Sequence, residues 1–235
     1  MDQLSESPLI VAQNLTRIYK LGVAAVIGIQ DVQLNIPGGE MVVIKGNSGS
    51  GKSTLLALLG GLDQPTSGRL TVAGQDLQKT TREQLNRYRR SVVGMVFQTF
   101  NLLPTLTVLE NVCLPALLAG RAFDEVRSEA LEWLKLLKLA DRLEHYPGQI
   151  SGGELQRTAI ARALINKPSI ILADEPTGNL DSRNGMAVIE VLADLNRRFK
   201  RTVILATHST LADHYATRQV CLQDGRVAEN GPWEQ

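Results

Sequence analysis

The sequence predicts an α/β protein whose core is a mainly parallel sheet, with a helical segment inserted near residues 100–165. Two observations support this prediction. The apolar runs at 41–44, 170–173 and 203–206 are continuous instead of alternating, which is typical of parallel strands buried on both faces. Helical patterns stand between these runs along the chain, and that alternation is the order expected of βα units.

The first half of the chain predicts short strands separated by turns, and one clear helix. Residues with high β-propensity, bounded by turn residues, mark the strands. The helix follows a glycine-rich loop. We expect strands at 9–13, 31–36, 41–45, 69–73 and 92–97, a helix at 52–61 and a turn at 63–67.

The second half begins with a helical pattern from 105 to 165. Within it, the apolar side chains of 124–139 fall on one helical face, at Val126, Ala130, Leu131, Leu134 and Leu137. Strands and helices then alternate again. We expect strands at 170–173, 203–206, 218–222 and 226–229, a helix at 183–199 and a turn at 224–225.

The composition is that of an ordinary soluble globular protein, with 43% apolar and 21% charged residues among 235. The net charge of +1 gives no global basic field, and this argues against a nucleic-acid partner. Basic residues cluster at 87–90 and 197–201. A solvated helix face or helix end is the favoured interpretation of both clusters, and contact with a membrane or membrane partner is the alternative.

Cys113 and Cys221 stand far apart, each beside apolar residues, so reduced and buried thiols are expected instead of a disulfide or metal site. No charged segment followed by an apolar core opens the chain, and no apolar run approaches the ~20 residues needed to span a bilayer. We therefore expect a cytosolic protein. Any membrane-spanning part of a complex would come from another chain.

Residues 46–54, GNSGSGKST, fit the pattern G-x-x-x-x-G-K-[ST] between a predicted strand and a predicted helix. The glycines allow successive N–H groups to point at phosphate oxygens, and the helix start adds the positive end of its dipole. Lys52 can reach the β- and γ-phosphates, and Ser53 can ligate Mg²⁺. Since a chance match has odds on the order of one in a hundred, we predict a nucleotide site. Its residues would be Asn47, Ser48, Gly49, Ser50, Gly51, Lys52, Ser53 and Thr54.

Polar side chains follow three other predicted strands at their carboxyl ends, where ligands bind in open parallel sheets. These side chains are Gln98, the pair Asp174 and Glu175, and His208. Asp174 is expected to hold Mg²⁺, and Glu175 to orient or deprotonate a water. Gln98 would hold that water or complete the metal shell, and His208 would bond the γ-phosphate. Any one of them alone is more often structural, but beside a phosphate loop they favour phosphoryl chemistry.

The stretch 149–157, QISGGELQR, predicts a helix start that also suits an anion. Ser151 and Glu154 have the S-x-x-E spacing of a capping box, and apolar residues follow. Gly152 and Gly153 in the first turn weaken a helix by ~1 kcal/mol each relative to alanine, which indicates that something comes very close to the backbone. A capped helix start without bulky side chains presents oriented N–H groups to a phosphate.

Together these motifs resemble those of the ATPase subunit of ATP-binding cassette (ABC) transporters, over nearly the whole chain. Residues 46–54 look like Walker A, 170–175 (IILADE) like Walker B and 151–157 (SGGELQR) like the ABC signature. The remaining matches are Gln98 at the Q-loop, 179–181 at the D-loop, His208 at the switch histidine and Tyr19 at the aromatic that stacks on adenine.

The resemblance implies a phosphate-loop NTPase core with an antiparallel N-terminal β-subdomain and a helical signature subdomain. A single nucleotide-binding domain would cover 1–235. Within it, residues 1–98 and 166–235 would form the α/β core with the β-subdomain, and residues 99–165 the helical subdomain.

It also implies an ATPase with ATP and Mg²⁺ as cofactors, in which two cassettes pair head to tail around two ATP molecules. Each ATP would lie between the Walker motifs of one chain and the signature of the other. The signature residues facing that ATP would be Ser151, Gly152, Gly153 and Glu154. Glu175 would be the general base, with Gln98 and His208 as the other catalytic residues, and Asp181 would link the two sites. The metal ligands would be Ser53, Gln98 and Asp174.

A finer likeness, carried by residues 58–68, 101–120 and 174–181, is to the MacB/LolD-type group of macrolide and peptide extruders and lipoprotein-release systems. It implies a bacterial exporter or mechanotransmission complex whose permease has a large extracytoplasmic domain and is contacted by about residues 99–112. The cassette would lie on the cytoplasmic face of the inner membrane. Ile150 and Glu154 replace the more usual Leu and Gln of the signature, but its serine and glycines are kept.

Three alternatives stand beside the exporter. The ATPase of a cell-division-type complex resembles this group but regulates cell-wall enzymes without transport. A DNA-repair or chromosome-structuring ATPase also carries an ABC signature. It is disfavoured because no sustained heptads separate the Walker motifs. A module that binds nucleotide without hydrolysis is disfavoured by Glu175 and His208.

Overall fold

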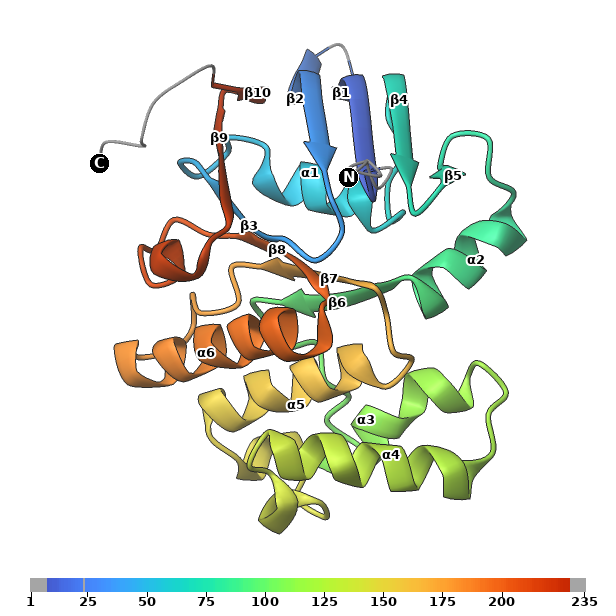
Figure 1. The fold of residues 1–235 in the computed structure, drawn as a ribbon, viewed down its shortest axis with the longest axis vertical. Coiled ribbons are helices and arrows are strands. Elements are labelled where there is room, and N and C mark those ends of the chain that lie inside the picture. The colour runs from blue at the N-terminus through green and yellow to red at the C-terminus, as the bar shows by residue number, and fades with distance from the viewer. Residues whose placement is uncertain (1–7, 23, 229–235) are drawn as a thin grey trace, which may run out of the picture.

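The computed structural model describes residues 8–22 and 24–228. Its main sheet has six strands in the order β10-β9-β3-β8-β7-β6, and we call it the parallel sheet (Figure 1). The strands β3 (Met41–Lys45), β6 (Val93–Phe97), β7 (Ile170–Asp174), β8 (Thr202–Ala206) and β9 (Arg218–Gln223) are parallel, and β10 (Arg226–Val227) pairs antiparallel with β9. The predicted fold class is confirmed. Residue 229 of the predicted last strand lies outside the described residues.

The second sheet is antiparallel, with the order β2-β1-β4-β5. Its strands are β1 (Ile10–Leu21), β2 (Ala24–Ile36), β4 (Ser67–Val72) and β5 (Gln75–Asp76). The predicted strands at 9–13 and 31–36 were wrong in length, since β1 has 12 residues and β2 has 13. Register shifts after Ala12, Leu15 and Arg17 interrupt the alternation of side chains, so the period-two pattern is lost in the middle of the pair.

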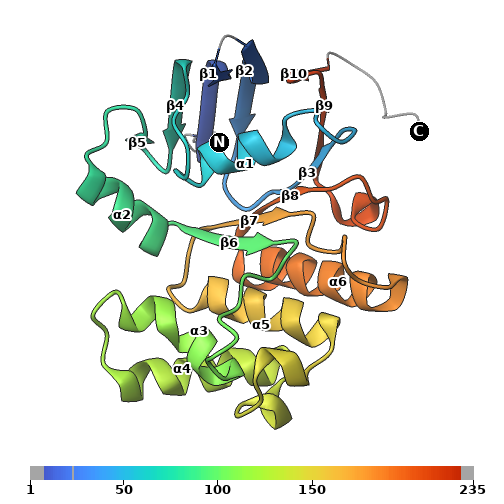
Figure 2. The same ribbon diagram turned by 180° about the vertical axis from the view of Figure 1, so that it is seen from behind.

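The parallel sheet is covered on both faces, which explains its continuous apolar strands. All five residues of β3 are buried. Met41 and Val43 pack into a core shared with the helices below the sheet, whereas Val42 and Ile44 pack into a core shared with α1 (Lys52–Leu59) and the antiparallel sheet. Figures 1 and 2 show α1 lying between the two sheets. Two-sided burial of this kind is what a parallel sheet requires.

The predicted helical insertion contains several helices, and they lie below the parallel sheet (Figure 2). The helix α6 (Ser182–Phe199), which is not part of the insertion, also lies below this sheet. The insertion is built from α3 (Val108–Leu117), α4 (Phe123–Leu136), η1 (Ala140–Arg142), η2 (Pro147–Gln149) and α5 (Gly152–Leu164). The helices predicted at 52–61 and 124–139 end earlier, at Leu59 and Leu136. The subdomain boundaries at 98/99 and 165/166 stay a prediction, and residues 1–7, 23 and 229–235 of the predicted domain lie outside the described residues.

The helix α2 (Arg82–Ser91) was missed as an element, although its arginines were interpreted as a helix face. Few apolar residues mark it, and it begins with a capping box made by Thr81 and Gln84.

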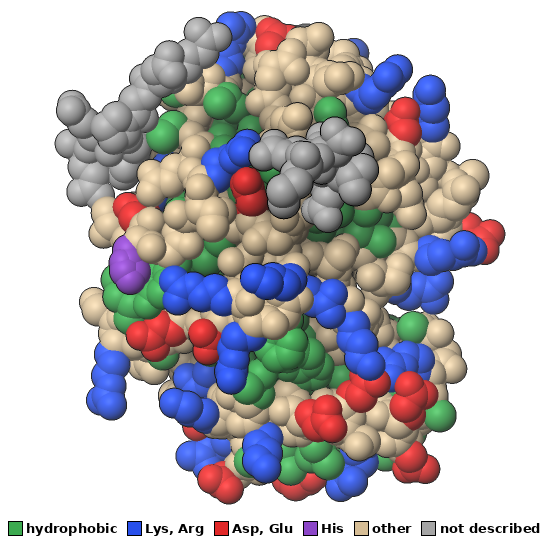
Figure 3. Space-filling model, viewed as in Figure 1, with side chains coloured by type: hydrophobic (Ala, Val, Ile, Leu, Met, Phe, Trp, Pro, Cys, Tyr) green, Lys and Arg blue, Asp and Glu red, His purple; other side chains and the backbone are tan. Residues whose placement is uncertain are grey.

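The second basic cluster also lies at a helix end, with Arg197 and Arg198 in the last turn of α6. Figure 3 shows one face of the molecule, on which Lys and Arg side chains form a band across the middle, with Asp and Glu side chains beside and below it.

Cys113 is buried, as predicted, whereas Cys221 is only partly buried. In the described part of the chain, none of the helices is both long enough and apolar enough to pass through a bilayer.

Candidate functional site

A cavity of about 830 Å³ opens at the carboxyl edge of the parallel sheet, beside the antiparallel sheet. Its walls come from β1, β2, the loop before α1, the start of α1 and the segments that follow β6, β7 and β8. It is lined by Tyr19, Val26, Ile27, Gly28, Asn47, Ser48, Gly49, Gly51, Lys52, Ser53, Thr54, Gln98, Glu175 and His208. The topology therefore gathers most of the predicted site residues into one pocket.

The loop between β3 and α1 forms the floor of this pocket. Gly49 and Gly51 have φ values of 79° and 102°, which favour glycine. A Cβ on Gly51 would lie 2.3 Å from the carbonyl oxygen of Gly28, so the loop passes too close to β2 for any side chain. Within the described chain, no side chain caps α1 at Gly51 and no acidic residue stands in its first turn. The first amides of α1 are thus available to an anion.

Lys52 lies over this loop and is only 7% exposed. Its ammonium donates to the carbonyl oxygens of Gly46 at 2.8 Å and Asn47 at 3.0 Å, and it lies 3.9 Å from Oε1 of Glu175. Such a geometry holds a positive charge between the loop and the carboxylate. Ser50, predicted to bind nucleotide, is buried and is not among the described residues that line the cavity.

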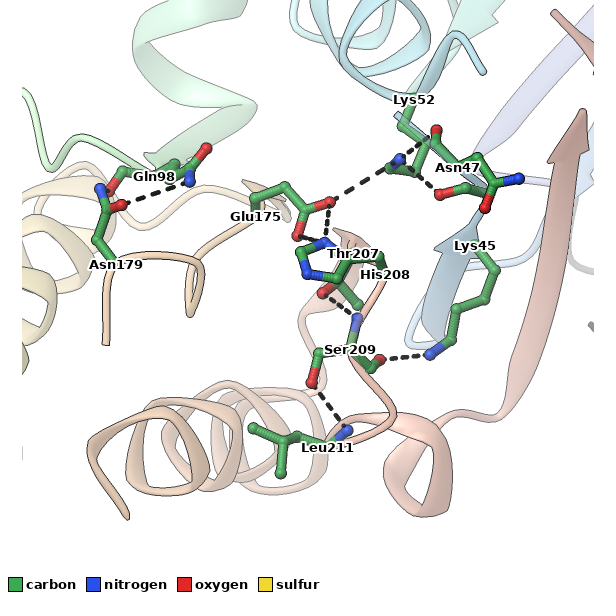
Figure 4. Close-up of polar contacts among 11 residues, drawn as sticks. Lys45, Asn47, Lys52, Gln98, Glu175, Asn179, Thr207, His208, Ser209 and Leu211 are labelled. Atoms are coloured by element: carbon green, nitrogen blue, oxygen red, sulfur yellow. Dashed lines mark hydrogen bonds and ion pairs between the residues drawn. The ribbon is translucent and has the colours of Figure 1, made fainter. Parts of the chain in front are cut away.

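Glu175 and His208 form the polar pair at the far wall (Figure 4). Nδ1 of His208 lies 3.1 Å from the carboxylate of Glu175. The Glu175 backbone has a φ of 43°, in the left-handed region, and its N–H donates to the carbonyl oxygen of Ala206 at 2.9 Å. A carboxylate placed beside an imidazole and a lysine can take a proton from a bound water.

Asp174, at the end of β7, supplies the second carboxylate. Burial raises its pKa above the ordinary value for aspartate, against the lowering effects of a hydrogen bond with Ser53 and the charge of Lys52. Its Oδ1 is buried and has no hydrogen-bond partner among the described residues. An orphaned carboxylate oxygen beside a serine hydroxyl is a donor set that suits Mg²⁺, which takes oxygen ligands.

Gln98 reaches the cavity wall, but its side chain is turned to the loop before α6. Its Nε2 donates to Oδ1 of Asn179 at 3.5 Å, and Nδ2 of Asn179 donates to the Gln98 carbonyl oxygen at 3.0 Å (Figure 4). The structure does not bring the Gln98 amide to Glu175 and His208. Its predicted role at the water or the metal would therefore require it to leave Asn179.

Tyr19 closes the pocket on the side of the antiparallel sheet and is fixed by two residues that sequence reasoning missed. Its hydroxyl donates to Oδ2 of Asp63 at 2.9 Å, and the guanidinium of Arg17 lies 4.6 Å from the ring centroid. Arg17 and Asp63 pair with each other at 2.8 Å. A Cβ on Gly28 would lie 2.8 Å from the Tyr19 ring, so glycine leaves room for the aromatic.

A sequence signal for part of this arrangement exists. Residues two apart in a strand point to the same face, so Arg17 could have been placed beside Tyr19. Asp63 is 44 residues from Tyr19 and gives no such local signal.

The helix start at Ser151 is the capping box that the spacing predicts. Oε2 of Glu154 accepts from the Ser151 backbone N–H at 2.8 Å, and the Ser151 hydroxyl accepts from the Glu154 N–H at 3.4 Å. Oε1 of Glu154 also accepts from Nε of Arg142 at 2.8 Å. The backbone bond from Ser151 lowers the pKa of Glu154 most, and Arg142 adds to this effect.

The signature residues 151–154 are not among the described residues that line the cavity. Packing within the chain also explains the glycine at position 153, because a Cβ there would lie 2.5 Å from Oδ1 of Asn184. Asp181 caps α6 by accepting from the Asn184 N–H at 2.9 Å, and that bond lowers its pKa. The roles predicted for these residues across a dimer stay predictions.

Comparison with known proteins agrees with this geometry. The family model described as ABC transporter matches residues 29–178. The "Uncharacterized ABC transporter ATP-binding protein MJ1508" of Methanocaldococcus jannaschii is 46% identical over 94% of this chain and 98% of its own length. The "Macrolide export ATP-binding/permease protein MacB" of Marinobacter nauticus is 46% identical over 97% of this chain, which spans only 35% of that protein.

Two solved structures share the fold. The "Dimeric Structure of MJ0796, a Bacterial ABC Transporter Cassette" superposes with a TM-score of 0.87 at 43% identity, over 94% of this chain and 97% of that one. A structure of a "post-hydrolysis state of the ATP-binding cassette MJ0796 bound to ADP and Pi" also gives 0.87, at 42% identity, over the same 94% and 97%. From the family match, these relatives and the shared fold, we conclude that this chain belongs to the ABC transporter family, as an ATPase cassette of the MacB and LolD type.

Proposed function

We propose that the chain is the motor subunit of a bacterial exporter or mechanotransmission complex and drives extrusion or release of a substrate through a membrane permease. The observation that carries this proposal is the pocket itself. It joins a phosphate loop, an aromatic side chain held in place at one end, and the Glu175–His208 pair at the other. Drug, peptide and lipoprotein substrates all fit the proposal, because the substrate would be bound by the permease.

In this proposal Tyr19 stacks on adenine, and the loop amides with Lys52 bind the phosphates. Glu175 accepts the proton of the attacking water, and His208 bonds the γ-phosphate. Ser53 and Asp174 would hold Mg²⁺, which when bound neutralises charge on the phosphates. Gln98 would join them once released from Asn179.

We further propose that two copies pair head to tail around two ATP molecules. The start of α5 is a capped helix end whose first residues lie outside the chain's own pocket. The Glu154 amide is bonded to the Ser151 hydroxyl, so the amides before it, together with the helix dipole, would serve a nucleotide held by another copy. The MJ0796 cassette, which shares the fold, has been solved as a dimer, and this supports the pairing.

A groove of about 470 Å³ supports docking of a permease near the predicted segment 99–112. It lies beside β6 and is lined by Arg89, Arg90, Met95, Asn101, Leu118 and Arg162, among others. Leu103 and Leu118 are 46% and 71% exposed, so apolar surface is available there. The MacB relative is named as an ATP-binding and permease protein, which supports a permease partner. A large extracytoplasmic domain on that partner, and a place for the cassette on the cytoplasmic face of the inner membrane, are further parts of the proposal.

The phosphate loop is the part to test first. Lys52→Ala is expected to lose ATP binding and hydrolysis, because it removes the charge between the loop and Glu175. Lys79→Ala is the matched control, since that lysine is 78% exposed on the surface. Equilibrium binding of a fluorescent ATP analogue and phosphate release measure the two effects. Unchanged turnover in Lys52→Ala would overturn the assignment.

A further inference from the structure

Lys45 is a buried cation that the nucleotide pocket does not use. It is the last residue of β3, directly before the phosphate loop, and its side chain is 2% exposed. A buried ammonium is costly unless it is paired and hydrogen-bonded. Its Nζ donates to the carbonyl oxygen of Ser209 and lies 2.6 Å from Oδ1 of Asp213.

Both partners of Lys45 belong to the segment that carries His208. Ser209 is the next residue along the chain, and Asp213 begins η3 (Asp213–Tyr215). Figure 4 shows the Lys45 side chain reaching from β3 to the Ser209 carbonyl, just beyond His208. The lysine thus joins the strand that leads into the phosphate loop to the segment that leads away from the switch histidine.

The same segment is also bonded through its backbone. The Thr207 N–H donates to the Ile44 carbonyl oxygen at 3.1 Å, and the Ser209 N–H donates to the Thr207 hydroxyl at 3.0 Å. The Leu211 N–H donates to the Ser209 hydroxyl at 3.3 Å. The first bond joins the start of the segment to β3, and the other two shape the turn, whereas Lys45 ties the outer part of the turn back to the sheet.

The imidazole of His208 depends on this support because packing does not hold it. Its side chain is 68% exposed, and it reaches Glu175 at 3.1 Å. An exposed ring keeps its place over a carboxylate only if the backbone beneath it is fixed. A shift of about 1 Å at a reacting group lowers a rate by up to about a hundredfold.

We propose that Lys45 is a positioning residue for His208. Its bond to Ser209 and its ion pair with Asp213 hold residues 207–213 against β3, so that the imidazole stays beside Glu175. The proposal rests on the proposed role of His208 in hydrolysis. Because the Lys45 ammonium reaches away from the phosphate loop, the effect belongs to turnover and not to nucleotide binding.

The test compares Lys45→Met, a variant of similar volume without the charge, with the wild-type full chain. We expect kcat to fall by about tenfold or more, while the Kd for a non-hydrolysable ATP analogue changes by less than about twofold. Asp213→Asn should shift kcat in the same direction, and Asp213→Glu should recover it. If Lys45→Met does not fold, Asp213→Asn carries the test, because that side chain is 34% exposed.

A double-mutant cycle with His208→Ala separates this proposal from the proposed function. If Lys45 acts through the histidine, Lys45→Met lowers kcat in wild type but has no further effect in the His208→Ala background. The same loss in both backgrounds would overturn the role of Lys45. A weaker Kd with unchanged kcat would overturn it too, since Lys45 would then act on the phosphate loop. Full turnover in His208→Ala alone would overturn the role of His208, and with it that of Lys45.

Discussion

Tyr19, the residue proposed to stack on adenine, is held in place by its neighbours. Arg17 lies against its ring, and Asp63 accepts from its hydroxyl while pairing with Arg17. With Gly28 leaving space beside the ring, these contacts fix the orientation of the aromatic before any nucleotide arrives. An oriented ring loses less conformational entropy when a base stacks on it.

Asp63→Ala is therefore expected to raise KM for ATP by about threefold to tenfold with kcat unchanged. The reason is that the interactions orienting the Tyr19 ring, worth about 1 kcal/mol, are lost. Tyr19→Ala should raise KM further. Asp76→Ala, at a partly exposed carboxylate of β5, is the control. Steady-state ATPase assays measure all three, and an unchanged KM in Tyr19→Ala would place adenine elsewhere.

Local motifs at this scale could be predicted from the sequence, whereas long-range supports could not. The phosphate loop and the Ser151 capping box are each defined by neighbours within a few residues, and the capping box is confirmed. The Arg17–Asp63 and Lys45–Asp213 pairs join residues on different elements, and no periodicity links their positions. Only the folded topology brings these charges together.

At the scale of elements, Glu129 of α4 adds a charged connection between this helix, which already packs into the core, and residues on either side of it in the chain. Glu129 accepts from Lys167, after α5, at 2.7 Å, and pairs with Arg121, before α4, at 2.9 Å. The hydrogen bond with Arg121 lowers its pKa most, against the effect of burial, and Lys167 lowers it as well. A lowered pKa means that folding favours the ionised form.

The consequence for stability has a definite sign. The contribution of Glu129 to the free energy of unfolding is fully present above the pKa that it has in the unfolded chain, about 4.5. This contribution is lost as the pH falls through its lower pKa in the folded chain. Glu129→Gln should destabilise the chain by about 1–2 kcal/mol at neutral pH, and the difference from wild type should shrink below that pH. Urea unfolding of the full chain from pH 7 to pH 4 measures it. Glu132→Gln, on the exposed face of the same helix, should show neither effect.

Element prediction succeeded where burial is simple and failed where pairing is irregular. Strands β3, β7 and β8 are buried on both faces, so their apolar runs mark them within a residue. The pair β1 and β2 has register shifts in its middle, and α2 has a single buried residue, Tyr88, so neither left a clear pattern.

At the scale of the whole molecule, the start of α5 lies outside the pocket of its own chain, and the proposed pairing would bring it to the pocket of a second copy. Glu175→Gln should keep ATP binding but stop hydrolysis, because the amide cannot take the proton of the water. ATP should then accumulate a dimer, since the bound nucleotide persists between the two halves. Size exclusion with light scattering measures this, with Lys52→Ala as the variant that stays monomeric. A monomeric Glu175→Gln with ATP, even beside its permease, would contradict the head-to-tail pairing.

The left-handed backbone of Glu175 has a further consequence. At a φ of 43° a residue with a Cβ is strained, and glycine is not. Of two inactive variants, Glu175→Gly should therefore be more stable than Glu175→Ala by about 1 kcal/mol, the reverse of their ranking in regular strands and helices. The fold thus keeps its carboxylate where selection for stability alone would have chosen glycine. Random variants recovered for heat resistance should accordingly accumulate losses of activity at this position.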